Sequence, residues 1–158
     1  MNMADIGTFP TIRNVLVDGD NIKSYTVGGT LAVKAGMTLA FHGTGVSNTV
    51  QASVKGTTVM PVGVALYDAD VGAQVAVACR GCRVYVANAE SDVAIDAGDP
   101  LEGNDNAIGG TVSAAALVIP GAVAVVQYVV GFAEEDIAAS ATGIMSVAPQ
   151  IMTAANNA

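Results

Sequence analysis

Short apolar runs separated by turn residues make up most of the chain. The runs are rich in Val and Ala, and Gly, Asn, Asp or Pro interrupts them about every 8 to 12 residues. No long segment keeps a helical period. The pattern therefore predicts an all-β fold, a compact sandwich or barrel. The predicted strands are residues 12–17, 21–27, 31–33, 37–41, 50–54, 58–66, 74–79, 83–87, 111–119, 122–133 and 143–148.

Two of these runs carry more specific signals. Asp18-Gly19 is the strongest hairpin signal, because both residue types tolerate the positive φ of a tight turn. It predicts that residues 21–27 return alongside residues 12–17. Residues 74–79 are apolar on both faces, so they predict a strand that is buried on both sides.

Three stretches are predicted to connect strands. Residues 95–101 favour a turn-rich link, residues 102–110 a polar loop, and residues 134–142 either a helical turn or a loop. The sequence contains no evident internal repeat of fixed period, which disfavours a solenoid.

The length of 158 residues fits a single domain with its own core. Residues 1–12 have no amphipathic period and are predicted to be an extended arm with little order in the free chain. The first ten also lack the basic start and apolar run of a secretory signal. Residues 13–149 are predicted to form the β domain, and residues 150–158 a mostly small and polar tail.

The composition points to a covered surface. The chain is 52% hydrophobic but only 13% charged, whereas soluble domains average about 25% charged residues. A surface so poor in charge predicts that another subunit covers part of it. The net charge is -8, and no Lys or Arg follows Arg83. Binding to nucleic acid or to a membrane surface is disfavoured, because both need clustered cations.

Residues 114–132 are apolar enough to resemble a membrane span. Pro120-Gly121 lies near their centre, Val dominates over Leu, and no basic residue flanks either end. Two buried strands joined by a Pro-Gly turn explain the segment better.

Cys79 and Cys82 form a CxxC motif between two segments with strand patterns. A redox motif would place its first Cys at a helix N-terminus. A structural zinc site needs four ligands, and the chain offers only these two Cys and His42. The favoured interpretation is that both Cys are structural residues beside a bend, with a disulfide, a redox pair or a metal site as alternatives.

The remaining polar residues give no catalytic pattern. His42 is the only histidine and is interpreted as a loop or strand-end residue. The spacing of four carboxylates does not match an EF-hand, and they are read as ordinary turn formers rather than Ca²⁺ ligands. These four are Asp96, Asp99, Glu102 and Asp105. The acidic run Glu134 to Asp136 predicts a solvated edge. No catalytic, cofactor-binding or metal-binding residue is assigned, and an enzyme is not expected.

Four segments in this order resemble the capsid cement (head decoration) proteins of tailed phages, from about Ile22 to Val147. They are residues 33–39 (VKAGMTL), residues 60–69 (MPVGVALYDA) with Gly72 and residues 74–78, residues 95–101 (IDAGDPL), and residues 129–134 (VVGFAE) followed by residues 143–147 (GIMSV). The Cys pair and the loop near Asn104 are not part of this pattern.

The resemblance implies a β-tulip-like protein without enzymatic activity or cofactor. It implies a homotrimer on the outer surface of the virion, bound to the major capsid protein where capsomers meet, and made in the host cytoplasm. An N-terminal arm would reach onto the capsid protein. The alternatives are a virion-surface β module for host or ligand binding and, less favoured, a CxxC redox or metal protein.

Overall fold

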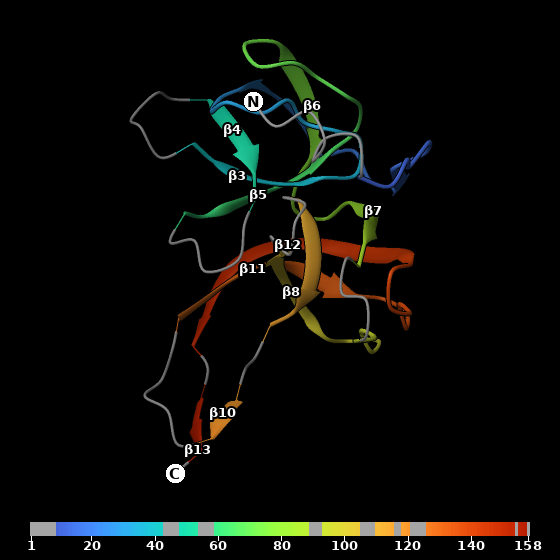
Figure 1. Cartoon of the computed structure of the whole chain (residues 1–158), viewed down its shortest axis with the longest axis vertical. Coiled ribbons are helices and arrows are strands. Elements are labelled where there is room, and N and C mark those ends of the chain that lie inside the picture. Colours follow the sequence, from blue (N-terminus) through green and yellow to red (C-terminus); the bar gives the residue numbers. More distant parts are fainter. Residues whose placement is uncertain are drawn as a thin grey trace.

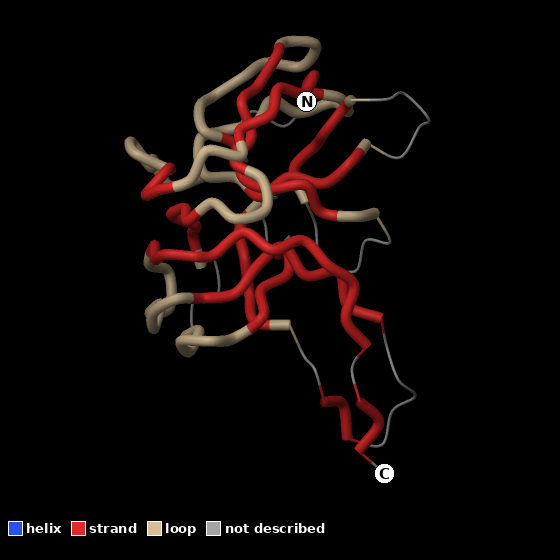
Figure 2. Tube along the Cα trace, turned by 180° about the vertical axis from the view of Figure 1, so that it is seen from behind, coloured by secondary structure: helices blue, strands red, loops and turns tan. Residues whose placement is uncertain are grey.

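The computed structural model consists of strands and loops, which confirms the expected all-β fold class (Figures 1 and 2). It describes residues 9–42, 48–53, 59–88, 93–104, 110–115, 118–120, 126–153 and 155–157. Within these ranges no residue is helical. No helix of the described chain is therefore long and apolar enough to cross a membrane.

The first half of the chain forms a closed five-stranded barrel, in the upper part of Figure 1. The pair β2–β4 is parallel and the other pairs are antiparallel. In their order around the barrel, the strands are β2 (Ile22–Val27), β4 (Thr49–Ala52), β3 (Thr38–Phe41), β5 (Pro61–Ala65) and β6 (Gln74–Ala78).

The second half forms, together with β1 from the beginning of the chain, a six-stranded sheet that curls on itself. A single parallel bridge between Asn88 and Val112 links the ends of β7 and β9. In sheet order the strands are β1 (Leu16–Asp18), β7 (Arg83–Ala87), β12 (Thr142–Thr153), β11 (Val126–Ala133), β8 (Pro100–Asn104) and β9 (Thr111–Ala114). A separate parallel pair joins β10 (Val118–Pro120) to β13 (Ala155–Asn157).

The two halves repeat one strand arrangement. We call the curled sheet the second barrel, because the Asn88–Val112 bridge brings β9 back to the end of β7. The strand order β7-β12-β11-β8-β9 repeats the order β2-β6-β5-β3-β4. The registers agree as well, because Leu101 faces Gly131 as Leu39 faces Gly63.

The same agreement holds on the other side of each barrel. Tyr85 faces Ile144 as Ser24 faces Ala76. The bridge between Asn88 and Val112 likewise repeats the parallel pair Val27–Val50. The chain therefore contains a structural repeat without a fixed period, which the expectation of no fixed-period repeat did not foresee.

The repeat is hidden in the sequence for a physical reason. Leu39 and Gly63 are closer in sequence than Leu101 and Gly131, so the two copies have no constant period. Most other matching positions need only be apolar, and different apolar residues fill them. The residue type is kept mainly where the backbone geometry requires it.

The interiors of the two barrels form one hydrophobic core. A single cluster of buried side chains includes Val64 and Val77 of the first barrel and Val86 and Met145 of the second. Ala78 is also fully buried, as expected for the two-sided apolar strand 74–79, while Ala76 is half-buried. Strand β5 of the first barrel packs against β11 and β12 of the second.

The hairpin expected at Asp18-Gly19 does not form. The turn itself exists, since Gly19 has φ 117°, but β1 pairs with β7 and β2 pairs with β6. The chain therefore crosses from the second barrel into the first at Gly19. A Cβ at Gly19 would lie 2.7 Å from the Cα of Cys82, so this crossing needs glycine.

Two other segments contain more strand than expected. The predicted polar loop 102–110 begins as strand β8, because β9 pairs with residues 102–104 and supplies backbone partners. Residues 105–109 lie outside the described residues. The last long strand was predicted to end at residue 148, but β12 continues through Pro149 to Thr153. Pro149 is tolerated because the β11–β12 ladder is interrupted there, between the pairs at Val129 and Gly131.

Other boundaries differ in detail. Residues 111–119 contain two short strands, β9 and β10, instead of one. Of residues 31–33, only Val33 makes a β-bridge, to Ala69. Residues 134–141 form a loop with a bridge at Ile137, and Thr142 already belongs to β12. Residues 1–8 of the expected arm lie outside the described residues.

Candidate functional site

Each barrel carries the same turn, fixed by an aspartate. In the first barrel the N–H of Ala35 donates to Asp68 Oδ1 (2.9 Å). The N–H of Gly36 donates to the carbonyl of Ala65 (2.8 Å), whose own N–H donates to the carbonyl of Met37 (2.9 Å). A carboxylate that accepts a backbone N–H replaces water at a turn and holds its shape.

The second barrel repeats this arrangement atom for atom. The N–H of Ala97 donates to Asp136 Oδ1 (2.9 Å), and the N–H of Gly98 donates to the carbonyl of Ala133 (2.8 Å). Asp99 takes the place of Met37, and its backbone carbonyl accepts the N–H of Ala133 (2.9 Å). We call residues 33–37 with Asp68, and residues 95–99 with Asp136, the twin turns.

The twin turns differ in charge and in cover. Lys34 Nζ lies 3.5 Å from Asp68 Oδ2 in the first, and Asp96 occupies the corresponding position in the second. Ile12 covers the first turn, since a Cβ on Gly36 would lie 2.5 Å from Ile12 Cδ1. A Cβ on Gly98 would meet nothing within 4 Å.

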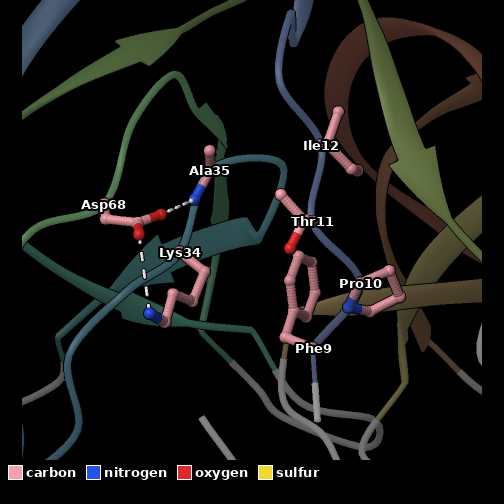
Figure 3. A pocket seen from close by; sticks show the side chains of 7 residues that line it. All are labelled: Phe9, Pro10, Thr11, Ile12, Lys34, Ala35 and Asp68. Atoms are coloured by element: carbon pink, nitrogen blue, oxygen red, sulfur yellow. Dashed lines mark hydrogen bonds and ion pairs between the residues drawn. The ribbon is translucent and has the colours of Figure 1, made fainter. Parts of the chain in front are cut away.

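A small pocket lies beside the first turn (Figure 3). Its volume is about 130 Å³, below the roughly 300 Å³ at which pockets accommodate drug-sized ligands. Phe9 and Ile12 are buried, so residues 9–12 of the expected arm pack against the first barrel. The pocket is lined by Phe9, Pro10, Thr11, Ile12, Lys34, Ala35 and Asp68.

Cys79 and Cys82 lie at the turn that carries the chain from the first barrel to the second. Both are free and buried. The N–H of Cys79 donates to the carbonyl of Asn21 (2.9 Å), and the carbonyl of Cys82 accepts the N–H of Val147 (2.8 Å). Burial raises the pKa of the Cys79 thiol, with Lys23 opposing the shift. A raised pKa favours the neutral thiol, which is a poor nucleophile and a poor metal ligand.

We expect the variant with both Cys79→Ala and Cys82→Ala to keep its fold. The lost sulfur atoms leave small voids, which should lower the free energy of unfolding by about 1 to 2 kcal/mol. Thermal unfolding followed by circular dichroism measures the change, and elemental analysis measures bound metal. A wild-type chain with one metal ion per molecule, together with an unfolded double variant, would show that the Cys pair is a metal site.

His42 sits at the end of β3 and is half-buried. Its ring packs on Gly28, where a Cβ would lie 2.8 Å from His42 Cδ2. Its backbone N–H donates to the carbonyl of Thr49 (3.0 Å). Among the described residues His42 Nδ1 has no hydrogen-bond partner. This environment fits the strand-end interpretation.

Of the four carboxylates considered for a cation, the three that the structure describes do not form one group. Asp99 Oδ2 accepts the N–H of Asp96 (3.0 Å) within the second turn. Glu102 is buried on β8, and Asp105 lies outside the described residues. No cluster of three or more metal-ligating side chains occurs in the part of the chain that the structure describes.

The acidic run Glu134 to Asp136 is more than the solvated edge that was predicted. Glu134 accepts hydrogen bonds from Ser146 Oγ (2.7 Å) and Arg83 Nε (2.6 Å). These donors, first Ser146 and then Arg83, lower the pKa of Glu134 against the opposing effect of burial. Glu135 accepts the N–H of Ile144 (3.0 Å). All three carboxylates therefore fix backbone or neighbouring side chains, which a run of like charges in sequence does not reveal.

Arg83 links the second barrel to β1. Besides its bond to Glu134, its Nη1 lies 3.2 Å from Asp18 Oδ2. These hydrogen bonds, the one to Glu134 first, raise the pKa of Arg83. The ion pairs are exposed, so they orient β1 more than they stabilise it.

No protein-family model and no curated protein matches this chain. The fold is similar to that in a solved structure, "The crystal structure of head fiber gp8.5 N base in bacteriophage phi29". The TM-score is 0.51 at 21% sequence identity, over 80% of this chain and 94% of that chain. The match is longer than either barrel alone, so it includes parts of both.

Proposed function

We propose that this chain is a structural protein of a tailed-phage head. In this proposal it binds the outer surface of the shell as a homotrimer where capsomers meet, and it stabilises the shell without catalysis. The observation that carries the proposal is the fold shared with a phage head fiber base over 94% of that chain. The cement-like sequence segments support it independently.

The sequence segments gain meaning from the duplication. The turn of the first barrel lies within residues 33–39 and 60–69. The turn of the second barrel lies within residues 95–101 and 129–134, except for Asp136, which follows two residues later. The resemblance to cement proteins therefore covers the same structural element twice. In both turns the conserved contacts hold the backbone in place, as a structural role requires.

The physical logic of the proposal is multivalency. A trimer that bridges three capsomers combines three modest contacts into tight attachment. Because it binds only the assembled shell, it raises the apparent stability of that shell by mass action. An acidic protein without a basic patch suits a position away from the packaged genome.

The test compares mature shells with and without the protein during heating. We expect saturable binding to the outside of the shell and a genome release temperature several degrees higher at full occupancy. At about 100 times the dissociation constant, linkage supplies about 2.7 kcal/mol for each site. Release is followed with a DNA-binding dye, and occupancy with labelled protein.

The control replaces this chain with an unrelated acidic β protein at the same concentration. Equal release temperatures at saturating occupancy would remove the stabilising role. Such a result would leave display on the virion surface or contact with the host.

A further inference from the structure

The second barrel carries an extension that the first barrel lacks. Val129 corresponds to Pro61, where β5 begins, yet β11 begins earlier, at Val126. Ser146 corresponds to Ala78, where β6 ends, yet β12 continues to Thr153. The two extra segments pair with each other from Val126–Thr153 to Val129–Gln150. We call residues 126–129 and 150–153 the ribbon.

The ribbon leads away from both barrels. Figures 1 and 2 show it running toward the pair β10–β13 at the end of the molecule opposite the first barrel. The first barrel closes without a corresponding segment, so the barrel fold does not require the ribbon. An ordered extension that the barrel fold does not require favours a contact with another molecule.

One face of the ribbon is apolar and exposed. Side chains alternate along a strand, so Val126 and Tyr128 share a face with their cross-strand partners Thr153 and Ile151. Val126 is 51% exposed and Ile151 is 56% exposed. Thr153 is also exposed and Tyr128 is half-buried.

The opposite face of the ribbon is better covered. It consists of Gln127, Val129, Gln150 and Met152, and none of these is exposed. The exposed apolar face is thus the side that points away from the rest of the chain. Like the core of a protein–protein interface, it has aliphatic and aromatic side chains and no charged ones.

Charge indicates which partner the exposed face accepts. The chain has a net charge of -8, so two copies repel each other over most approaches. No charged residue occurs between Asp105 and Glu134 or after Asp136. The ribbon therefore offers like-charged copies a surface on which no carboxylates oppose each other.

We propose that the exposed face of the ribbon is the contact between copies of this chain. In the homotrimer of the proposed function, on which this inference rests, Val126, Tyr128 and Ile151 of each copy face the three-fold axis. The barrels, which carry the charged side chains, lie farther out. A segment of the shell protein is the competing occupant.

The first test is Ile151→Asp, examined by sedimentation velocity on the free protein without shells. Three carboxylates at the axis would each be buried without a partner, so association should weaken by at least about a hundredfold. The wild type should sediment as a trimer and the variant as a monomer with an unchanged far-UV spectrum. Val93→Asp is the matched control, because Val93 is apolar and 52% exposed but lies outside the ribbon. It should remain a trimer.

The second test does not depend on disrupting the contact. In Ile151→Cys, a bifunctional thiol reagent should link two copies into a covalent dimer, whereas Val93→Cys should give none. The native Cys79 and Cys82 are buried and contribute little background. A trimeric Ile151→Asp, or absent cross-linking in trimeric Ile151→Cys, would overturn the inference.

The outcomes separate this inference from the function itself. A wild-type chain that is monomeric without shells overturns the ribbon contact, while binding to shells and the release temperature still test the function. An Ile151→Asp chain that stays trimeric but no longer binds shells assigns the ribbon to the shell protein. A chain that trimerises through the ribbon but never binds shells keeps the inference and rejects the function.

Discussion

Replacing Gly131 with Ala should lower the free energy of unfolding by at least about 3 kcal/mol. A Cβ at Gly131 would lie closer than 3.0 Å to the backbone carbonyl oxygen of Ser146, a separation that real Cβ atoms essentially never show. It would also lie 2.9 Å from the Met145 side chain. Strand β12 cannot move aside, because it pairs with β11 on one side and β7 on the other.

The duplication extends this prediction to the first barrel. Gly63 faces the carbonyl oxygen of Ala78 in the same way, so Gly63→Ala should be as damaging as Gly131→Ala. Urea unfolding followed by circular dichroism measures both variants. Gly72→Ala is the matched control, since Gly72 has φ 87° but nothing within 4 Å. It should cost only about 1 to 2 kcal/mol, from backbone strain. Equal effects at Gly131 and Gly72 would contradict the close approach of β11 and β12.

Leu39→Ala and Leu101→Ala should each lower the free energy of unfolding by about 2 to 5 kcal/mol. The two side chains are fully buried and hold the same position in the two barrels. Since both belong to one core, either substitution should shift a single unfolding transition of the whole molecule.

Differential scanning calorimetry distinguishes one transition from two. Leu31→Ala is the control, because Leu31 is 38% exposed and its loss should change stability by no more than about 0.5 kcal/mol. A Leu39→Ala profile in which one barrel melts early and the other at its original temperature would show that the barrels are independent units.

For the candidate sites, the sequence predicted the residues that act locally. The Cys pair lies at a bend between strands, as expected, and Asp96 and Asp99 lie in a turn. It could not predict what the acidic run does. Glu134 follows β11 and meets Arg83 of β7 only because these two strands flank β12 in the sheet. Asp136 reaches Ala97 only because the chain returns beside it. Contacts between segments far apart in sequence leave no local signal.

The sequence by itself determined the all-β class, most strand positions and the glycine turns. These follow from local causes: apolar side chains at strand spacing, and residue types that permit a turn. It also predicted from two apolar faces that residues 74–79 are buried on both sides, which holds for Val77 and Ala78 but only in part for Ala76.

Only the tertiary structure decided which strands pair, that the chain contains one barrel twice, and that β12 continues into an exposed ribbon. Backbone hydrogen bonds form between almost any two strands, and the choice of partner depends on side chains far apart in the sequence, so no local pattern predicts it. The copies share residues where geometry is strict, as at Gly63 and Gly131 or at Asp68 and Asp136, and at some core positions, as at Leu39 and Leu101. At many other positions different apolar residues fill the core, so the two barrels keep the same register although much of their sequence differs.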